Sequence, residues 1–145
     1  MKSTYDLQRF IIAQEAIYTM VLHELRGGEK RGHWMWYIFP QIGGLGHSVM
    51  AKKYAITSHE EAKAYLEHPL LGSRLRECTE LVVNLTGRSA EDIFAYPDNL
   101  KFRSSMTLFS EASTEDSIFH KALLKYFEGM PDPLTLHLLK LPGKD

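Results

Sequence analysis

Apolar side chains recur at helical spacing in the first stretch of the chain, from residue 7 to residue 25. They lie three or four residues apart, which is the spacing of one face of an amphipathic helix, at Leu7, Phe10, Ile11, Ile17, Tyr18, Val21, Leu22 and Leu25. Asp6 precedes this stripe as a plausible N-cap, and Gly27 and Gly28 follow it as stop signals. The pattern predicts one long helix over residues 7–25.

Similar patterns predict helices along the rest of the chain, over residues 47–54, 58–68, 71–85, 89–94, 102–109 and 119–127, and after Asp132-Pro133. Ser58 with Glu61 has the spacing of a capping box, and Ser89 with Asp92 marks another helix start. Alternation with a period of two is not sustained, and only residues 36–39 and 81–85 could form strands. The sequence therefore predicts an all-α fold, a compact multihelical bundle of about seven helices in one domain over residues 1–145, with one aromatic loop that contains Gly and Pro.

Composition and charge narrow the classes of partner. A chain of 145 residues with 44% hydrophobic and 24% charged residues is typical of a globular protein with a real hydrophobic core. The formal net charge of -1 gives no field that would attract nucleic acid or an anionic membrane, so neither is expected as a partner. The N-terminal residues do not show the pattern of a signal peptide. We expect a cytoplasmic protein, and its oligomeric state stays open.

The segment from residue 31 to residue 48 combines features that rarely occur together. It contains both tryptophans of the chain, yet a proline and four glycines interrupt regular structure. Loops are usually polar because their backbone faces water, so an irregular aromatic segment either fills the core or surrounds a ligand. Trp34, Trp36 and Gln41 could line an aromatic pocket with a polar handle, or the aromatic side chains could simply pack in the core. The glycines of residues 43–46 could let a phosphate approach the backbone, or could form a flexible turn.

A second group of candidate residues lies in residues 98–105. If Asp98 caps the helix predicted there, Lys101 falls in its first turn, where the helix dipole favours acids and disfavours cations. Other predicted helix starts carry acids at these positions, so the exception indicates a function or a specific partner. Lys101, Arg103 and Ser104 could receive an anion together with free backbone N–H groups. The alternative is that the two cations form surface salt bridges.

Several runs of residues resemble one family of proteins. The runs extend over nearly the whole chain: Leu7-Gln8-Arg9-Phe10 with Gln14, Lys30 through His33-Trp34-Met35-Trp36 to Phe39-Pro40-Gln41, Gly44-Leu45-Gly46, Glu61-Ala62 with Tyr65-Leu66, His68-Pro69-Leu70-Leu71-Gly72 with Arg74-Leu75, and Lys101 through Arg103-Ser104-Ser105-Met106-Thr107-Leu108-Phe109. The chain resembles the bacterial domain-of-unknown-function family 1810, whose members are short proteins sometimes labelled calpastatin. The resemblance implies a compact multihelical domain and implies no activity. The calpastatin label carries no weight, because this chain is apolar, unlike a disordered inhibitor.

Few residues are candidates for reaction chemistry. One cysteine excludes an internal disulfide and multi-cysteine metal sites, and the histidines show no recognised ligand spacing, so neither a metal nor a cofactor is expected. Cys78 lies in an apolar stripe, which favours a buried thiol over a nucleophile. Gln14 faces inward on its helix, which favours a core residue bonded to nearby backbone over a ligand-binding group. His33 and His47 are the catalytic candidates, because histidine titrates near neutral pH without assistance.

Three functions are consistent with these residues. The first is recognition of a small anionic ligand with a planar part, such as a nucleotide-like metabolite, in a pocket that both groups of candidates form if they meet in space. The second is a hydrolase-type enzyme that uses the same pocket with His33 or His47 as acid or base. The third is a protein–protein interaction module in which exposed tryptophans act as binding hot spots. Whether the chain is an enzyme stays open.

Overall fold

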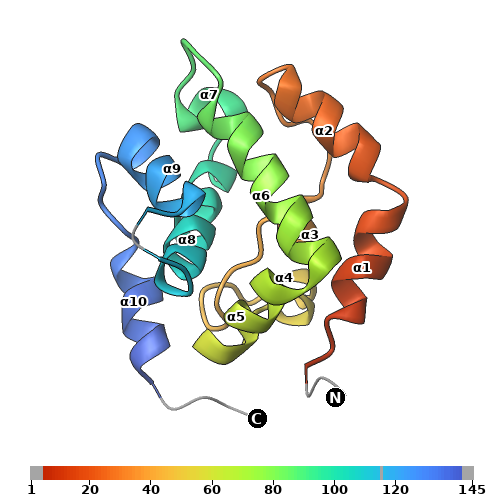
Figure 1. The fold of residues 1–145 in the computed structure, drawn as a ribbon, viewed down its shortest axis with the longest axis vertical. Helices are drawn as coiled ribbons and strands as arrows, with labels where there is room; N and C mark the ends of the chain where they lie inside the picture. Colours follow the sequence, from red (N-terminus) through yellow and green to blue (C-terminus); the bar gives the residue numbers. More distant parts are fainter. Residues whose placement is uncertain (1–4, 115, 142–145) are drawn as a thin grey trace.

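The regular elements of the protein are helices (Figure 1), in a computed structural model that describes residues 5–114 and 116–141. The helices within these residues are α1 (Gln8–Glu15), α2 (Tyr18–Arg26), α3 (Met35–Ile38), α4 (Val49–Lys53), α5 (His59–Glu67), α6 (Pro69–Val83), α7 (Ala90–Phe94), α8 (Asp98–Glu111), α9 (Ile118–Phe127) and α10 (Pro133–Lys140). The predicted all-α fold is confirmed. Ten helices replace the expected seven or so in the described part of the chain.

The long first helix predicted over residues 7–25 is in fact two helices. The chain breaks at Ala16 and Ile17, between α1 and α2. The two helices are joined by a tight turn, in which the Ile17 N–H donates to the carbonyl of Gln14 at 3.1 Å. Because the turn is short, the apolar residues of both helices face the core, and their spacing continues across the break. The prediction of Asp6 as N-cap is also wrong, because Leu7 occupies that position without a side-chain cap.

Other helix starts follow the sequence signals more closely. Ser89 and Asp92 form the predicted capping box at α7. The Ser58 hydroxyl accepts from the Glu61 N–H at 3.1 Å, but the Glu61 carboxylate turns to the N–H of Thr57 at 2.7 Å. Residues 36–39, which could have been a strand, lie largely in the short helix α3.

Helix α6 runs across the molecule between α1 and α2 on one side and α8 and α9 on the other (Figure 1). Helix α8 is buried on almost all sides from Phe102 to Phe109, as expected for a helix that packs against neighbours all round. The Phe39 ring, which follows α3, meets the rings of Phe94 and Phe102 edge-on, with centroids 5.9 and 5.0 Å away. This contact joins the aromatic segment to the core.

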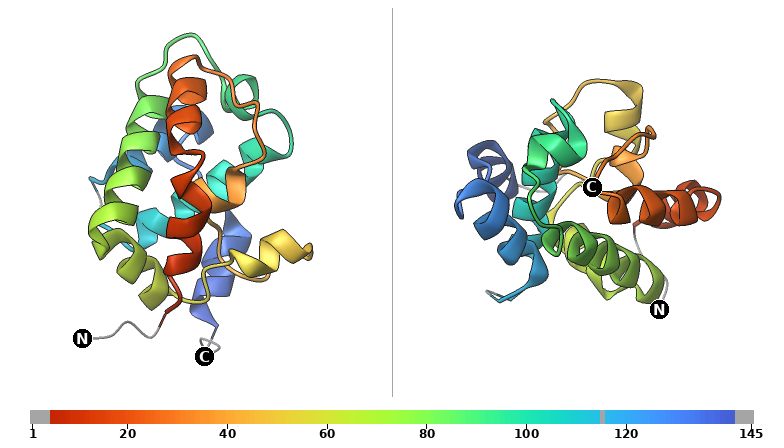
Figure 2. Two further views of the ribbon diagram at one scale, coloured as in Figure 1. Left: turned by 90° about the vertical axis from the view of Figure 1, so that its right-hand side faces the viewer. Right: turned by 90° about the horizontal axis from the view of Figure 1, so that it is seen from above.

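Helix α4 stands apart from this packed body. Both views in Figure 2 show it projecting from the side of the molecule, and it contains no buried residue. It lies within a loop of residues 41–56 that is closed at its base by an isolated bridge between Ile42 and Ile56. The loop therefore contains the last part of the aromatic segment, residues 41–48, and the projecting helix that follows it.

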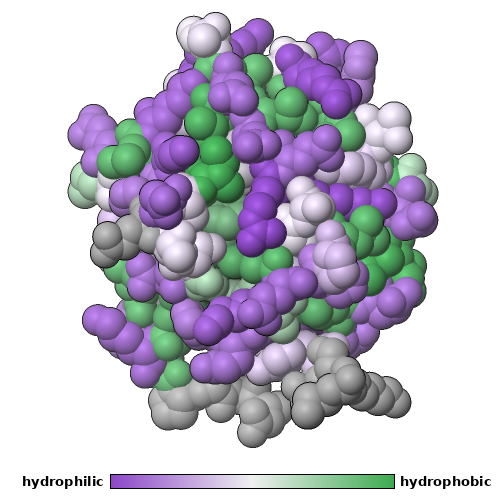
Figure 3. Space-filling model, in the orientation of Figure 1, coloured by the Kyte–Doolittle hydropathy of each residue, from purple (hydrophilic) through white to green (hydrophobic). Residues whose placement is uncertain are grey.

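The helices in the part of the chain that the structure describes are at most 15 residues long. None of its helices is long and apolar enough to cross a membrane. On the face shown in Figure 3, hydrophilic side chains are interspersed with groups of hydrophobic ones.

Candidate functional site

A cavity of about 150 Å³, which we name the Trp36 cavity, lies between α3, α4 and the loop that joins them. Its lining residues are Trp36, Gln41, Ile42, Gly43, Gly44, Leu45, Gly46, Ala51, Lys52, Tyr54 and Ala55. Two of the residues predicted as ligand-binding, Trp36 and Gln41, thus border the same space. Residues 43–46, which we name the glycine loop, form one of its walls.

The glycine loop is held by backbone contacts and close packing. The Gly43 N–H donates to the carbonyl of Ile56, and the Ile56 N–H donates to that of Gln41, both at 2.8 Å. Gly44 has a φ of 103°, which strains any residue with a side chain. A Cβ at Gly46 would lie 2.7 Å from the Cβ of Ala51. The loop can therefore approach α4 only because this position is glycine.

Arg9 fastens the end of α4 to the body of the protein. Its Nε donates to the carbonyl of Lys53 and its Nη2 to the carbonyl of Ala55, both at 2.8 Å. Its Nη1 lies 3.3 Å from Oε2 of Glu61, a carboxylate that is almost fully buried. Sequence reasoning missed Arg9 because Glu61 was interpreted only as a helix-start acid. A buried acid needs a charged partner, but nothing in the sequence locates that partner.

Trp34 lies in the core and not in the cavity. Its side chain is 1% exposed, and its indole N–H donates to Oε1 of Glu24 at 2.9 Å. The same oxygen accepts from the N–H groups of Arg31 at 2.7 Å and Gly32 at 3.0 Å. Burial raises the pKa of the Glu24 carboxyl, but these hydrogen bonds outweigh it and hold the pKa below its ordinary value. The hypothesis of an interaction module needs exposed tryptophans, and Trp34 does not meet that need.

Lys101, from the second group of candidate residues (98–105), contacts Trp36 of the cavity. Its Nζ lies 4.6 Å from the centre of the Trp36 ring, a cation–π contact. Asp98 holds it there, with Oδ1 at 3.4 Å from the Lys101 ammonium and Oδ2 at 2.8 Å from that of Lys30. Lys30 in turn lies over the Trp34 ring, 5.2 Å from its centre. The two tryptophans are therefore linked through two lysines and one shared carboxylate.

Helix α8 begins one residue earlier than in the prediction from the sequence, in which Asp98 is the N-cap. Pro97 is the N-cap of this helix, and Asp98 is its first helical residue. Lys101 consequently lies in the fourth helical position, and the adjacent Asp98 carboxylate offsets the unfavourable dipole.

Arg103 and Ser104 contact a different part of the protein. Arg103 donates to the carbonyls of Met130 and Pro131 at 2.9 and 2.8 Å. The Ser104 hydroxyl donates to Oδ2 of Asp132 at 2.8 Å. These contacts fix the segment that leads into α10. Neither residue lines the Trp36 cavity.

The two histidines proposed as catalytic candidates, His33 and His47, are exposed. Neither lines the Trp36 cavity, although His47 follows directly after Gly46. Gln14 is the core residue that the sequence favoured. Its Nε2 donates to the carbonyl of Tyr37 at 2.7 Å and to the hydroxyl of Tyr65 at 3.1 Å.

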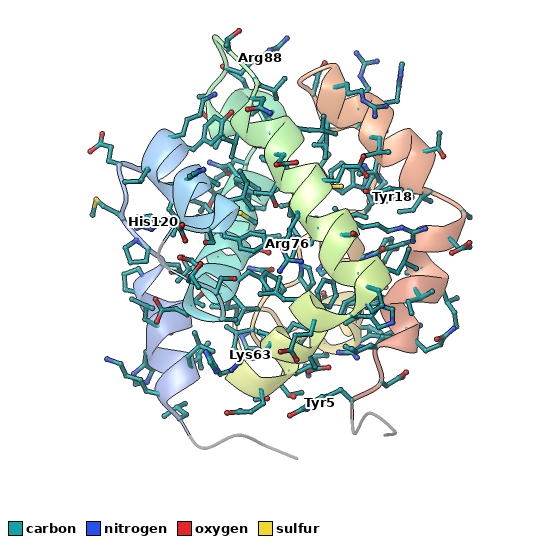
Figure 4. All side chains as sticks on the ribbon, in the orientation of Figure 1. Tyr5, Tyr18, Lys63, Arg76, Arg88 and His120 are labelled. Carbon is teal, nitrogen blue, oxygen red and sulfur yellow. The ribbon has the colours of Figure 1, made fainter. Side chains whose placement is uncertain are left out.

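Cys78 is buried as expected. Burial raises the pKa of its thiol to about 12, and its Sγ lies 3.8 Å from the hydroxyl of Tyr18. Tyr18 of α2 (Figure 4) donates to Oε1 of Glu77 at 2.6 Å. Within the residues that the structure describes, no group of three His, Cys, Asp or Glu side chains is arranged to hold a metal.

The fold and the cavity define a small all-α protein with an aromatic pocket the size of one ring. The chain belongs to the family described as protein of unknown function (DUF1810), whose model matches residues 4–139. Its structure is similar to the 1.38 Å crystal structure of the conserved hypothetical protein Rv1873 from Mycobacterium tuberculosis, with 52% sequence identity and a TM-score of 0.94. The match covers 97% of this chain and 100% of that chain. No curated protein matches the sequence.

Proposed function

We propose that the protein binds a small ligand with a planar ring and an anionic group in the Trp36 cavity. The observation that carries this proposal is that Trp36 and Gln41 border one cavity together with the glycine loop and Lys52. The activity of the family is unknown, so the proposal rests on the geometry and charge of this cavity.

The size and lining of the cavity suit a single planar ring. An apolar cavity of about 150 Å³ binds benzene, and the Trp36 cavity has about this volume. Trp36 and Tyr54 offer aromatic surface, and stacking of a base on an aromatic side chain stabilises a complex by about 1–3 kcal/mol. Gln41 adds an amide that can donate and accept hydrogen bonds. A nucleobase ring or a benzoate ring fits this description.

Positive charge and hydrogen-bond donors for the anionic group of the ligand lie at the edge of the same cavity. Lys52 lines it and forms no ion pair within the described part of the chain. The N–H groups of Gly44 and Gly46 have no hydrogen-bond acceptor among the described residues. Lys101 adds positive charge on the Trp36 ring. Together these groups favour a carboxylate or a phosphate over a neutral substituent.

Isothermal titration calorimetry with adenosine monophosphate, benzoate and inorganic phosphate tests the proposal. We expect the two ring compounds to bind and phosphate alone to bind more weakly, because it has no ring to stack. Trp36→Leu should weaken ring binding roughly tenfold or more. Lys52→Met should weaken it by up to about fivefold.

Lys63→Met is the control for Lys52→Met. Lys63 is an exposed lysine of α5 that does not line the cavity and forms no ion pair within the described part of the chain, so its loss should leave affinity unchanged. The proposal is wrong if neither ring compound binds, or if Trp36→Leu, shown by circular dichroism to be folded, binds them as tightly as the unmodified protein.

A further inference from the structure

A second cavity, which we name the leucine cavity, lies on the other side of the glycine loop. It has a volume of about 470 Å³ and is bounded by the loop, the start of α5 and the end of α10. Its lining residues are Ile42, Gly43, Gly44, Thr57, Ser58, His59, Glu60, Leu138, Leu139 and Leu141. Three leucines and an isoleucine make one side of it apolar.

The two cavities share part of one wall. Ile42, Gly43 and Gly44 line both of them, so a short piece of backbone separates the Trp36 cavity from the leucine cavity. Gly44 is exposed, and a Cβ at this position would lie 3.1 Å from Cδ2 of Leu138. A side chain there would occupy the space between the loop and α10. The glycine leaves it open.

The volumes indicate that the Trp36 cavity is only part of a binding site. Pockets for small molecules usually have volumes of about 300–1,000 Å³. The Trp36 cavity falls below this range, and the leucine cavity lies within it. A ligand whose ring fills the smaller space has room for its remaining atoms across Gly43 and Gly44.

The character of the leucine cavity favours an uncharged chain. Binding of an aliphatic group would remove the apolar side of this cavity from water, which is favourable. Glu60 lies at its polar side and forms no ion pair within the described part of the chain, so a second anionic group would be repelled. The polar residues there have local partners: the Ser58 hydroxyl accepts from Glu61 N–H, and His59 Nε2 lies 3.0 Å from the carbonyl of Glu111.

We propose that the ligand is an amphiphile, with a planar anionic head in the Trp36 cavity and an aliphatic chain that crosses Gly43 and Gly44 into the leucine cavity. The inference rests on the proposed function and names the class of ligand for the same site. It makes the leucine cavity the place where chain length is recognised.

Titration with benzoate, para-butylbenzoate and para-octylbenzoate, each below its aggregation concentration, tests the inference by calorimetry. The three compounds share one head and differ only in the chain. We expect affinity to rise along the series, by at most roughly fourfold for each buried methylene. Leu141→Ser should remove much of the gain from the octyl chain and leave the affinity for benzoate unchanged.

Leu134→Ser is the matched control. Leu134 and Leu141 are 49% and 48% exposed, but only Leu141 lines the leucine cavity. Affinity for all three compounds should therefore be unchanged in Leu134→Ser, whereas chain-dependent affinity falls in Leu141→Ser.

The outcomes separate this inference from the proposed function. If benzoate binds but the chain adds nothing, or if both leucine variants behave alike, the inference is wrong and the proposed function stands. If para-octylbenzoate binds equally well to Trp36→Leu, the head does not occupy the Trp36 cavity, and both proposals are wrong. If none of the three compounds binds, the inference is wrong, and the proposed function is wrong as well if adenosine monophosphate does not bind either.

Discussion

Burial decides which single residues of this protein can react. Cys78 is fully buried beside Tyr18, and the pKa of its thiol is raised by burial to about 12. The reactive form of cysteine is the thiolate, which is therefore scarce at neutral pH. We expect the native protein to react with an aromatic disulfide reagent only as fast as it unfolds, and the denatured protein to react at once.

Cys78→Ala should retain the fold and any ligand binding, at a cost of about 1–2 kcal/mol in the free energy of unfolding, as for a small core truncation. Urea denaturation measures this cost. Rapid labelling of the folded protein would contradict the buried position of the thiol.

The sequence located part of the candidate site at the scale of residues. Trp36 and Gln41 could be found because loops are usually polar, so that an aromatic residue beside an amide in a Gly- and Pro-containing loop indicates either a core segment or a ligand site. Lys52 and Tyr54 could not, since nothing in their spacing distinguishes them from other residues of an exposed helix. Arg103 was selected for its charge. The sequence did not reveal that its charge is used by two backbone carbonyls in residues 130–131.

At the scale of elements, the attachment of α10 depends on α8. Arg103 donates to two carbonyls just before α10, and Ser104 and Thr135 both donate to the Asp132 carboxylate, at 2.8 and 2.6 Å. We expect Arg103→Met to lower the free energy of unfolding by about 1–3 kcal/mol, because the carbonyls of Met130 and Pro131 lose their hydrogen bonds from a charged donor. Denaturation in urea measures the change.

Lys121→Met provides the comparison for Arg103→Met. Lys121 is an exposed cation of α9 with no side-chain partner among the described residues, so its loss should change stability little. Equal stability of Arg103→Met and the unmodified protein would show that the contacts to Met130 and Pro131 do not hold α10.

Most helices could be predicted from the sequence, because the signals that start and end a helix lie within a few residues of each other. Helix starts such as that of α7 depend on contacts within one turn, and the sequence contains those contacts in full. The break between α1 and α2 was missed because both helices face the same core and preserve the apolar spacing. The closure of residues 41–56 depends on Arg9, which is far away in sequence, and local patterns carry no information about such contacts.

At the scale of the whole molecule, several tyrosine hydroxyls and one thiol that are buried or partly buried should make the fold sensitive to alkali. Burial raises the pKa of the Tyr18, Tyr65 and Tyr126 hydroxyls and of the Cys78 thiol. Below about pH 7.5 these groups are protonated in both the folded and the unfolded chain, because the ordinary pKa is about 8.5 for cysteine and about 10 for tyrosine. As the pH rises further, the unfolded chain ionises first, so the free energy of unfolding must fall.

Urea denaturation at about pH 8 and about pH 10.5 should show this fall. Tyr65→Phe removes one of the groups and should make the fall smaller, although it also loses the hydrogen bond from Gln14. Stability that does not change between the two pH values would contradict the burial of these groups.

The unequal burial of the two tryptophans has a consequence for spectroscopy. Indole emission moves to longer wavelength in polar surroundings, and a collisional quencher dissolved in water reaches only exposed rings. Trp34 is 1% exposed, whereas Trp36 is half-buried, borders a cavity and has an ammonium group over its ring. The emission of the protein should therefore separate into a blue, unquenched component from the core and a red, quenchable component from the candidate site. The same molecule thus carries one optical signal for the integrity of its fold and another for the contents of its cavity.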